Sequence, residues 1–203
     1  MDSIHDLPEM ETTIIRPYAS RRKFLGVLGA GLAGMTIAPM ETMAGNSSGL
    51  TATQLAAWNR FMAEYAAYLS KQRIRYISVR QIVEAHMKNH GPVRNTPPPR
   101  SMWKNIVPTL RVADRVAYEL RAPLDEVVSV YRSPRYNATC PGAKRESMHT
   151  RNLALDIRFK ASPGRVAAAA EKLRKKGYFR GGIGRYGTFT HIDTRGENVD
   201  WHG

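Results

Sequence analysis

The chain has 203 residues, enough for one domain with a substantial core, and 42% of them are hydrophobic while 24% are charged. These proportions are ordinary for a soluble folded protein, and beyond the first 45 positions no apolar run reaches the length of about 20 residues that a membrane-spanning helix needs. The excess of 31 Lys and Arg over 17 Asp and Glu gives a net charge of +14, which favours anionic partners: nucleic acid, an anionic lipid surface or an acidic polymer such as the bacterial cell wall.

The first 44 residues have the layout of a cleavable export signal. Residues 24–39 form a modestly apolar stretch rich in Gly and Ala, and a cleavage site is expected after Ala44. The preceding run "SRRKFL", residues 20–25, resembles the twin-arginine (Tat) signal with which bacteria export folded proteins. An amphipathic or buried helix is the alternative, which the glycines disfavour. We therefore expect residues 1–44 to be a signal peptide and the mature protein to be periplasmic, without a stable membrane span and without nucleic acid as a partner.

The first part of the folded domain, residues 45–203, is predicted to be helical. Apolar residues spaced three or four apart predict an amphipathic helix over 51–69 and a shorter helix over 79–88. A proline-rich stretch over 91–103 excludes a regular helix or a central strand and predicts an ordered loop. A broad apolar face then predicts a further helix over 105–121.

Strand patterns dominate the second part of the domain. β-branched residues in 124–134 predict a strand that runs into a loop, and alternation over 153–159 predicts a strand with Asp156 on the side away from the core. Residues 162–179 favour a helix, and residues 181–196 favour two short strands around a glycine-rich tight turn. The order of these elements predicts a single α+β domain with a central, mainly antiparallel sheet flanked by helices.

Two histidines and one aspartate stand out among the predicted strands. His149 lies seven residues before Asp156, and an adjacent strand can bring His191 beside them, with Asp193 on the same side of that strand. Two imidazoles and one carboxylate are a ligand set for catalytic zinc, which keeps a fourth position open for water. Since Cys140 is the only cysteine, a cysteine-based zinc site is excluded. From the residues alone, hydrogen-bonded polar side chains at strand ends remain an alternative.

Three ordered segments resemble the zinc D,D-peptidases related to D-Ala-D-Ala dipeptidases, the LAS metallopeptidases. The run "SMHTRNLALD", residues 147–156, resembles the SxHxxGxAxD motif of that family. The run "THID", followed by Trp201, resembles its downstream histidine element. The run "VYRSPRYN", residues 130–137, resembles the substrate-side segment and carries Arg132. Order and spacing match over residues 127–201.

This resemblance implies a zinc-dependent peptidase of the exported murein endopeptidase branch, which hydrolyses peptide cross-links or stem peptides of bacterial peptidoglycan. It implies a fold like that of hedgehog and the D-Ala-D-Ala peptidases, with a helical part at 51–121 and a catalytic core at 127–203. Arg132 becomes the candidate to bind a substrate carboxylate or to stabilise the oxyanion, because its planar guanidinium suits both. The implied ligands of Zn²⁺ are His149, Asp156 and His191.

Two departures from the family pattern concern the turn and the proton acceptor. Asn152 replaces the motif glycine, and asparagine tolerates a left-handed backbone. Thr188 stands three residues before the last histidine, where several relatives have an acidic residue. Asp193 is then the candidate general base, or else it orients His191. A non-catalytic peptidoglycan-binding protein of the same fold is therefore the alternative function, and Trp201 is either a cleft wall or a packing residue.

Overall fold

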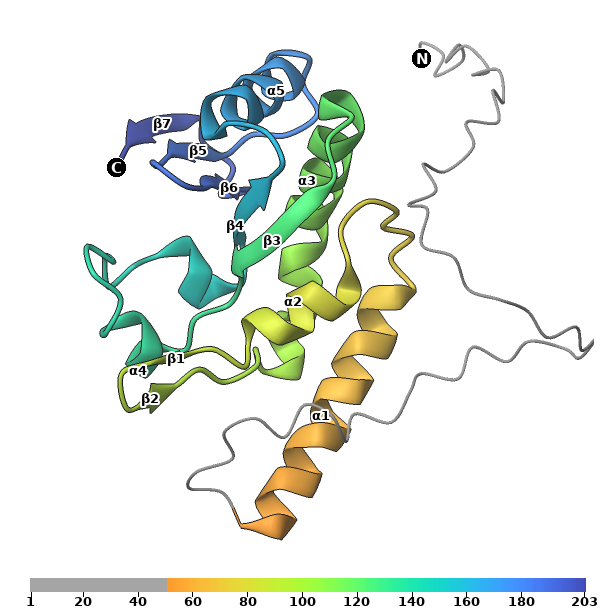
Figure 1. The fold of residues 1–203 in the computed structure, drawn as a ribbon, viewed down its shortest axis with the longest axis vertical. Coiled ribbons are helices and arrows are strands. Elements are labelled where there is room, and N and C mark those ends of the chain that lie inside the picture. The colour runs from red at the N-terminus through yellow and green to blue at the C-terminus, as the bar shows by residue number, and fades with distance from the viewer. Residues whose placement is uncertain (1–50) are drawn as a thin grey trace, which may run out of the picture. The chain divides into compact units, whose positions relative to one another are not determined.

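A five-stranded sheet organises residues 51–203, the part of the chain that the computed structural model describes (Figure 1). Its strands lie in the order β3-β4-β6-β5-β7, and every neighbouring pair is antiparallel except β5 and β7, which are parallel. The strands are β3 (Leu124–Ser129), β4 (Ala154–Phe159), β5 (Gly182–Arg185), β6 (Thr190–Asp193) and β7 (Val199–His202). The prediction of an α+β domain with a mainly antiparallel sheet is confirmed, while the export signal predicted over 1–44 lies outside the described residues.

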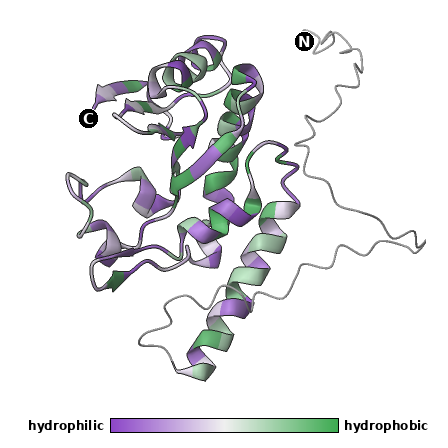
Figure 2. Cartoon of the chain, in the orientation of Figure 1, coloured by the Kyte–Doolittle hydropathy of each residue, from purple (hydrophilic) through white to green (hydrophobic). Residues whose placement is uncertain are grey.

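Helices cover one face of this sheet, and the hydrophobic core lies between the two layers. The main helices are α1 (Ala52–Ser70), α2 (Val79–Ala85), α3 (Ile106–Leu120) and α5 (Pro163–Lys175). Both α3 and α5 pack on the sheet, and Leu110 of α3 and Leu173 of α5 belong to the same core cluster as Leu155 and Ile157 of β4. In Figure 2, hydrophobic residues alternate with hydrophilic ones along α1 and α3, as expected for helices that bury one side.

Local signals set the helix ends close to the predicted positions. The hydroxyl of Thr51 accepts a hydrogen bond from the Gln54 N–H and the Gln54 side chain accepts one from Thr51, which forms a capping box at the start of α1. Ser162 caps α5 in the same place as its predicted start. The second helix ends at Ala85, three residues before the expected end. Within residues 51–203, no helix is both long and apolar enough to cross a bilayer.

The connections between these elements carry short pieces of structure. A two-stranded hairpin and three short helices interrupt them: β1 (Asn89–His90), β2 (Val93–Arg94), η2 (Arg100–Asn105), α4 (Pro134–Asn137) and η3 (Met148–Arg151). The proline-rich stretch 91–103 contains no regular helix, as expected, but it also contains β2 and the start of η2.

The two short strands predicted over 181–196 are present as β5 and β6, and only the position of the turn differs. The first glycines of this range, expected in the tight turn, lie in β5 at 182–185, and the turn follows at 186–189. A Cβ built on Gly182 would lie 2.5 Å from the Asp193 carboxylate, and one on Gly184 would lie 2.5 Å from the Trp201 ring. The glycines are therefore needed for close packing within the strand.

Candidate metal centre

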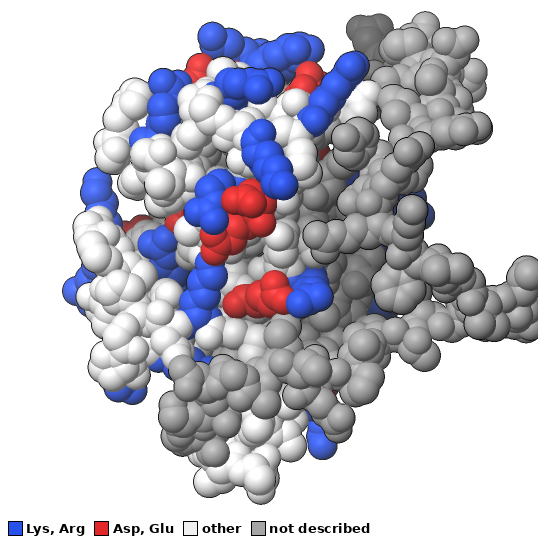
Figure 3. All heavy atoms as spheres, in the orientation of Figure 1, with Lys and Arg blue, Asp and Glu red and all other residues white. Residues whose placement is uncertain are grey.

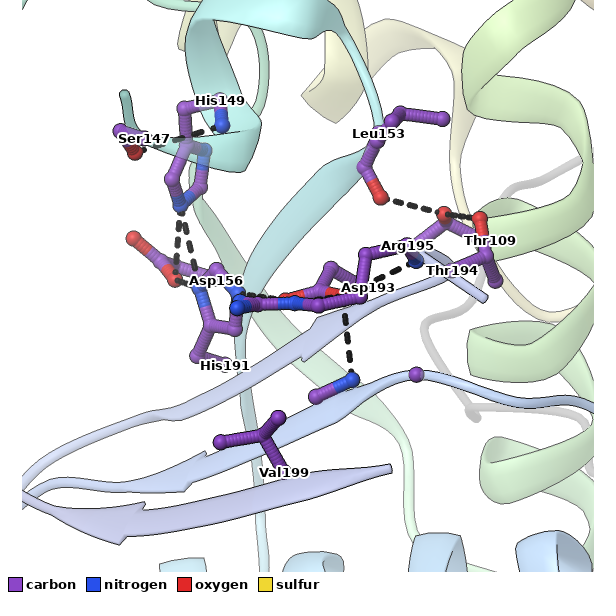
Figure 4. A network of polar contacts seen from close by, with 12 residues as sticks. Thr109, Ser147, His149, Leu153, Asp156, His191, Asp193, Thr194, Arg195 and Val199 are labelled. Carbon is purple, nitrogen blue, oxygen red and sulfur yellow. Dashed lines mark hydrogen bonds and ion pairs between the residues drawn. The ribbon is translucent and has the colours of Figure 1, made fainter. Parts of the chain in front are cut away.

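Three side chains from different elements converge on the open face of the sheet (Figure 4). His149 comes from η3, Asp156 from β4 and His191 from β6. The Nε2 atom of His149 lies 3.1 Å from Oδ1 of Asp156 and 3.2 Å from Nδ1 of His191, and that Nδ1 lies 2.8 Å from the same Oδ1. One ligand atom from each residue therefore points to a common position.

Strand register and one left-handed residue produce this convergence. Asp156 and His191 are directly paired across β4 and β6. Asn152 ends η3 with a φ of 55°, and its side-chain amide donates to the carbonyl of Met102 at 3.0 Å. This sharp turn brings His149 back over the strand that follows it. Asparagine therefore provides the left-handed conformation for which the family motif has glycine.

Hydrogen bonds to the opposite ring nitrogens orient both histidines. Nδ1 of His149 bonds the carbonyl of Val130, which leaves Nε2 to face the centre. Nε2 of His191 donates to Oδ2 of Asp193 at 2.9 Å, which leaves Nδ1 to face the centre. Metal-binding histidines are commonly fixed in this way by a carbonyl or a carboxylate on the second nitrogen.

Asp193 is saturated with hydrogen bonds and has no exposed surface. Besides His191, it accepts from the backbone N–H of Gly182 at 3.0 Å and from the backbone and guanidinium of Arg195, the closest contact being 2.5 Å from Nη2. Burial raises the pKa of this carboxyl, but the donors outweigh burial and hold its pKa well below the usual range. These contacts favour orientation of His191 over proton transfer to and from a substrate.

Arg132 lies at the centre, as the resemblance implied. Its Nη2 donates to Oδ2 of Asp156 at 2.5 Å, and its Nε donates to the hydroxyl of Ser129 at 2.8 Å. The first bond fixes Asp156 so that its other oxygen faces the two histidines. Arg132 also lines the cleft.

Burial and charge separate the titration behaviour of the two histidines. Burial lowers the pKa of His149, and the neighbouring Asp156 offsets only part of this effect. Burial also lowers the pKa of His191, but bonds to two carboxylates, Asp156 and Asp193, outweigh burial and raise it overall. The same two histidines hold the pKa of Asp156 well below its usual range, against the effect of burial. The aspartate is therefore an anion across the neutral range, as a metal ligand must be.

The centre forms the floor of a cleft of about 700 Å³. Trp201 lines one wall, and its ring centroid lies 5.0 Å from that of His191. Its Nε1 donates to the Tyr186 hydroxyl at 3.0 Å, and Tyr186 stacks on Phe189 at 4.4 Å. The structure thus places Trp201 at the cleft wall, one of the two positions considered from the sequence.

Other polar residues near the centre are divided between the cleft and the surface. Ser147 caps η3 and lines the cleft, and Cys140 lines it as well. Thr188 is exposed in the turn between β5 and β6 and does not line the cleft. Asp200 pairs with Arg174 of α5 at 2.6 Å, on the helical side of the sheet.

Sequence reasoning missed Arg195 and the carbonyl of Val130 as parts of this centre. A basic residue two positions after a buried aspartate is a weak signal for the first, since the chain has many basic residues. The surface in Figure 3 has basic side chains spread widely over it, with acidic groups beside some of them. A backbone carbonyl leaves no signal in the side-chain pattern at all.

The donor set fits zinc. Tetrahedral zinc with bonds of about 2.0–2.1 Å separates its ligand atoms by about 3.3 Å, and the three atoms here lie 2.8 to 3.2 Å apart. Two imidazole nitrogens and one carboxylate oxygen are also the ligand types of catalytic zinc sites. His149, Asp156 and His191 are thus able to bind a metal ion.

Comparison with known proteins identifies the family. A family model described as Peptidase M15 matches residues 76–193, a range that contains all three converging side chains and Arg132. No curated protein and no solved structure matches the chain. The resemblance to this type of peptidase is therefore confirmed for the family, and the chain belongs to the peptidase family M15.

Proposed function

We propose that this protein is a zinc-dependent peptidase that hydrolyses peptide cross-links or stem peptides of bacterial peptidoglycan. The observation that carries the proposal is the convergence of His149 Nε2, Asp156 Oδ1 and His191 Nδ1 at the floor of an open cleft in a chain of the M15 family. When bound there, Zn²⁺ lowers the pKa of a coordinated water to about 7 and polarises the substrate carbonyl.

The residues around the ligands have distinct tasks in this proposal. Asp193, held by Arg195, keeps the His191 ring oriented. Arg132 holds Asp156 and presents its remaining guanidinium donors to a substrate carboxylate or to the oxyanion. Trp201 forms a wall that limits the access of bulk water to the centre.

Two side chains that line the cleft are candidates for the proton acceptor of the proposed hydrolysis. Besides the metal ligands, Glu146 and His202 are the carboxylate and imidazole side chains among the cleft-lining residues of the described chain, and both are types of side chain that serve as general bases. Glu146 lies three residues before His149 and pairs with Arg151 at 3.0 Å. The variants Glu146→Gln and His202→Gln, assayed at saturating zinc, identify the acceptor as the one whose loss lowers turnover by about 100-fold or more.

Net charge and the N-terminal pattern support the proposed substrate and location. A chain with a net charge of +14 suits the anionic peptides and polymers of the cell wall. The twin-arginine pattern in residues 20–25 supports export to the periplasm, where peptidoglycan lies. We therefore propose peptidoglycan peptides, and not nucleic acid, as the partner.

Digestion of purified sacculi tests the peptidase proposal. The zinc-loaded protein is expected to release new muropeptides that mass spectrometry detects, and a chelator is expected to abolish the release. His149→Ala and Asp156→Asn remove two ligands and should abolish it as well, whereas Gln81→Ala changes a partly exposed residue of α2 that bonds the Asp125 carbonyl, away from the cleft, and serves as the folding control. Undiminished cleavage by the two ligand variants would refute the proposed centre.

A non-catalytic peptidoglycan-binding protein is the second candidate function. Two observations favour it: Thr188 replaces an acidic residue of several relatives, and the nearby Asp193 is fully buried. This candidate predicts that the protein sediments with sacculi but releases no fragment from them. Metal-dependent release of muropeptides would exclude it.

A further inference from the structure

Asn95 is a buried amide from the helical half of the domain that reaches the segment carrying Arg132. Asn95 is only 1% exposed, and it lies directly after β2, in the proline-rich stretch. Nδ2 of Asn95 donates to the carbonyl of Tyr131 at 2.8 Å, and Oδ1 accepts from the N–H of Ser133 at 3.0 Å. The two bonds therefore fix the backbone at the residues directly before and after Arg132.

A third backbone bond lies between these two. The N–H of Arg132 itself donates to the carbonyl of His149 at 3.2 Å, so the segment is tied to a proposed metal ligand as well. Three consecutive residues thus have one fixed backbone group each. With the backbone fixed in this way, the Arg132 side chain is oriented by the bond from its Nε to the Ser129 hydroxyl, and its Nη2 then reaches Asp156.

Asn95 has firm support of its own. Its backbone N–H donates to the carbonyl of Lys88 at 3.1 Å, across the small hairpin. The ammonium group of Lys88 bonds Glu126 at 2.6 Å and the carbonyl of Val128 at 2.8 Å, both on β3. The hairpin is therefore attached to β3, the strand that precedes Arg132, and Asn95 joins the same hairpin to the residues on either side of Arg132.

We propose that Asn95 is a positioning residue for Arg132, which it aligns with Asp156 and with the substrate. Asparagine suits this task because its amide presents a donor group and an acceptor atom side by side, as the Tyr131 carbonyl and the Ser133 N–H require. Asn95 does not line the cleft, so it acts through Arg132 and not on the substrate. The catalytic consequence rests on the proposed function, whereas the alignment itself is a property of the fold.

A double-mutant cycle on hydrolysis of a cross-linked muropeptide at saturating zinc tests this role. Wild type, Asn95→Ala, Arg132→Ala and the double variant are compared by kcat/KM. We expect Asn95→Ala to lower kcat/KM by about 100-fold, since a misplacement of about 1 Å has an effect of that size. In the Arg132→Ala background the same change should cost no more than about two-fold, because its target is already absent.

Gln81→Ala is the matched control for this cycle. Its side-chain amide donates to the Asp125 carbonyl at 3.0 Å, near the far end of β3 from the cleft, and should change kcat/KM by less than about two-fold in either background. An equal loss from Asn95→Ala in both backgrounds, or no loss in either, would overturn the proposal. If Asn95→Ala does not fold, Asn95→Ser replaces it in the same cycle, because its hydroxyl keeps a polar group at this buried position but is too short to bond both the Tyr131 carbonyl and the Ser133 N–H.

Crystal structures separate failure of this inference from failure of the proposed function. A wild-type protein that hydrolyses no muropeptide would refute the peptidase proposal alone. The positioning role is then decided by whether the Arg132 guanidinium remains within hydrogen-bond distance of Asp156. Displacement in Asn95→Ala, with no displacement in Gln81→Ala, would support the role, and an unchanged Arg132 in Asn95→Ala would overturn it.

Discussion

Asp193→Asn removes the charge from a carboxylate that five N–H groups surround, without changing its size. Those donors come from His191, Gly182 and Arg195. An asparagine amide has only one oxygen, so its NH₂ group must face other donors and the bond to His191 or those to Arg195 must weaken. We expect the His191 ring to lose its fixed orientation, while the cleft itself keeps its lining.

The expected loss is in metal affinity. Changes of residues that orient a metal-binding histidine cost about 10- to 100-fold in affinity, or about 1.4 to 2.7 kcal/mol. The dissociation constant of Zn²⁺ is measured by competition with a chromophoric chelator for wild type and for Asp193→Asn. Turnover is then measured at zinc concentrations that saturate both proteins, and it should differ by less than about 10-fold.

A proton-transfer role for Asp193 has the opposite signature. Loss of a general base lowers turnover by about 100- to 10,000-fold and leaves metal affinity nearly unchanged. That result would refute the assignment of Asp193 to the orientation of His191. Arg195→Met serves as a companion variant, since it leaves the carboxylate in place but removes the cation that holds it, and it should weaken zinc binding in the same direction.

Three further changes test other parts of the account. Burial lowers the pKa of His86 to about 3, so below about pH 6.5 the unfolded chain binds a proton here that the folded chain does not. The free energy of unfolding should therefore decrease toward acid, by about 2 kcal/mol at pH 5. Urea unfolding of the metal-free protein at pH 8 and pH 5 measures this loss, and an equal loss in His86→Leu would contradict the explanation. Gly184→Ala places a Cβ 2.5 Å from the Trp201 ring. The ring should therefore move away from the cleft wall toward water, and the tryptophan emission should shift to longer wavelength. Unchanged emission relative to wild type would argue against that packing. Removal of zinc by a chelator should lower the Tm, since an ion that binds only the folded chain stabilises it, and an unchanged Tm would count against a metal in the folded protein.

Periodic patterns in the sequence predicted most of the sheet and helices. The apolar face of α3 and the alternation of β4 each follow from one repeated spacing, so local reasoning is enough for them. Strand β7 was not predicted, because it has four residues, mostly exposed, and pairs only at the sheet edge. The turn between the two strands of 181–196 lies later than glycine content predicts, because Gly182 and Gly184 are needed inside β5, where their missing side chains make room for Asp193 and Trp201.

The candidate site divides in the same way. Its ligand types and their spacing were visible in the sequence, and the register of Asp156 with His191 follows from two strand patterns. The partners that hold these groups were not visible. Asn95 lies 37 positions before Arg132, and its role depends on two backbone groups that any residue carries. Contacts of this kind depend on tertiary packing, which no local pattern encodes.

A crystal structure of the zinc-soaked protein, with anomalous data collected at the zinc edge, tests the central claim most directly. The account predicts one zinc ion within about 2.0 to 2.2 Å of His149 Nε2, Asp156 Oδ1 and His191 Nδ1, with a fourth position open to the cleft. An anomalous peak elsewhere, or no peak at these three atoms, would contradict it.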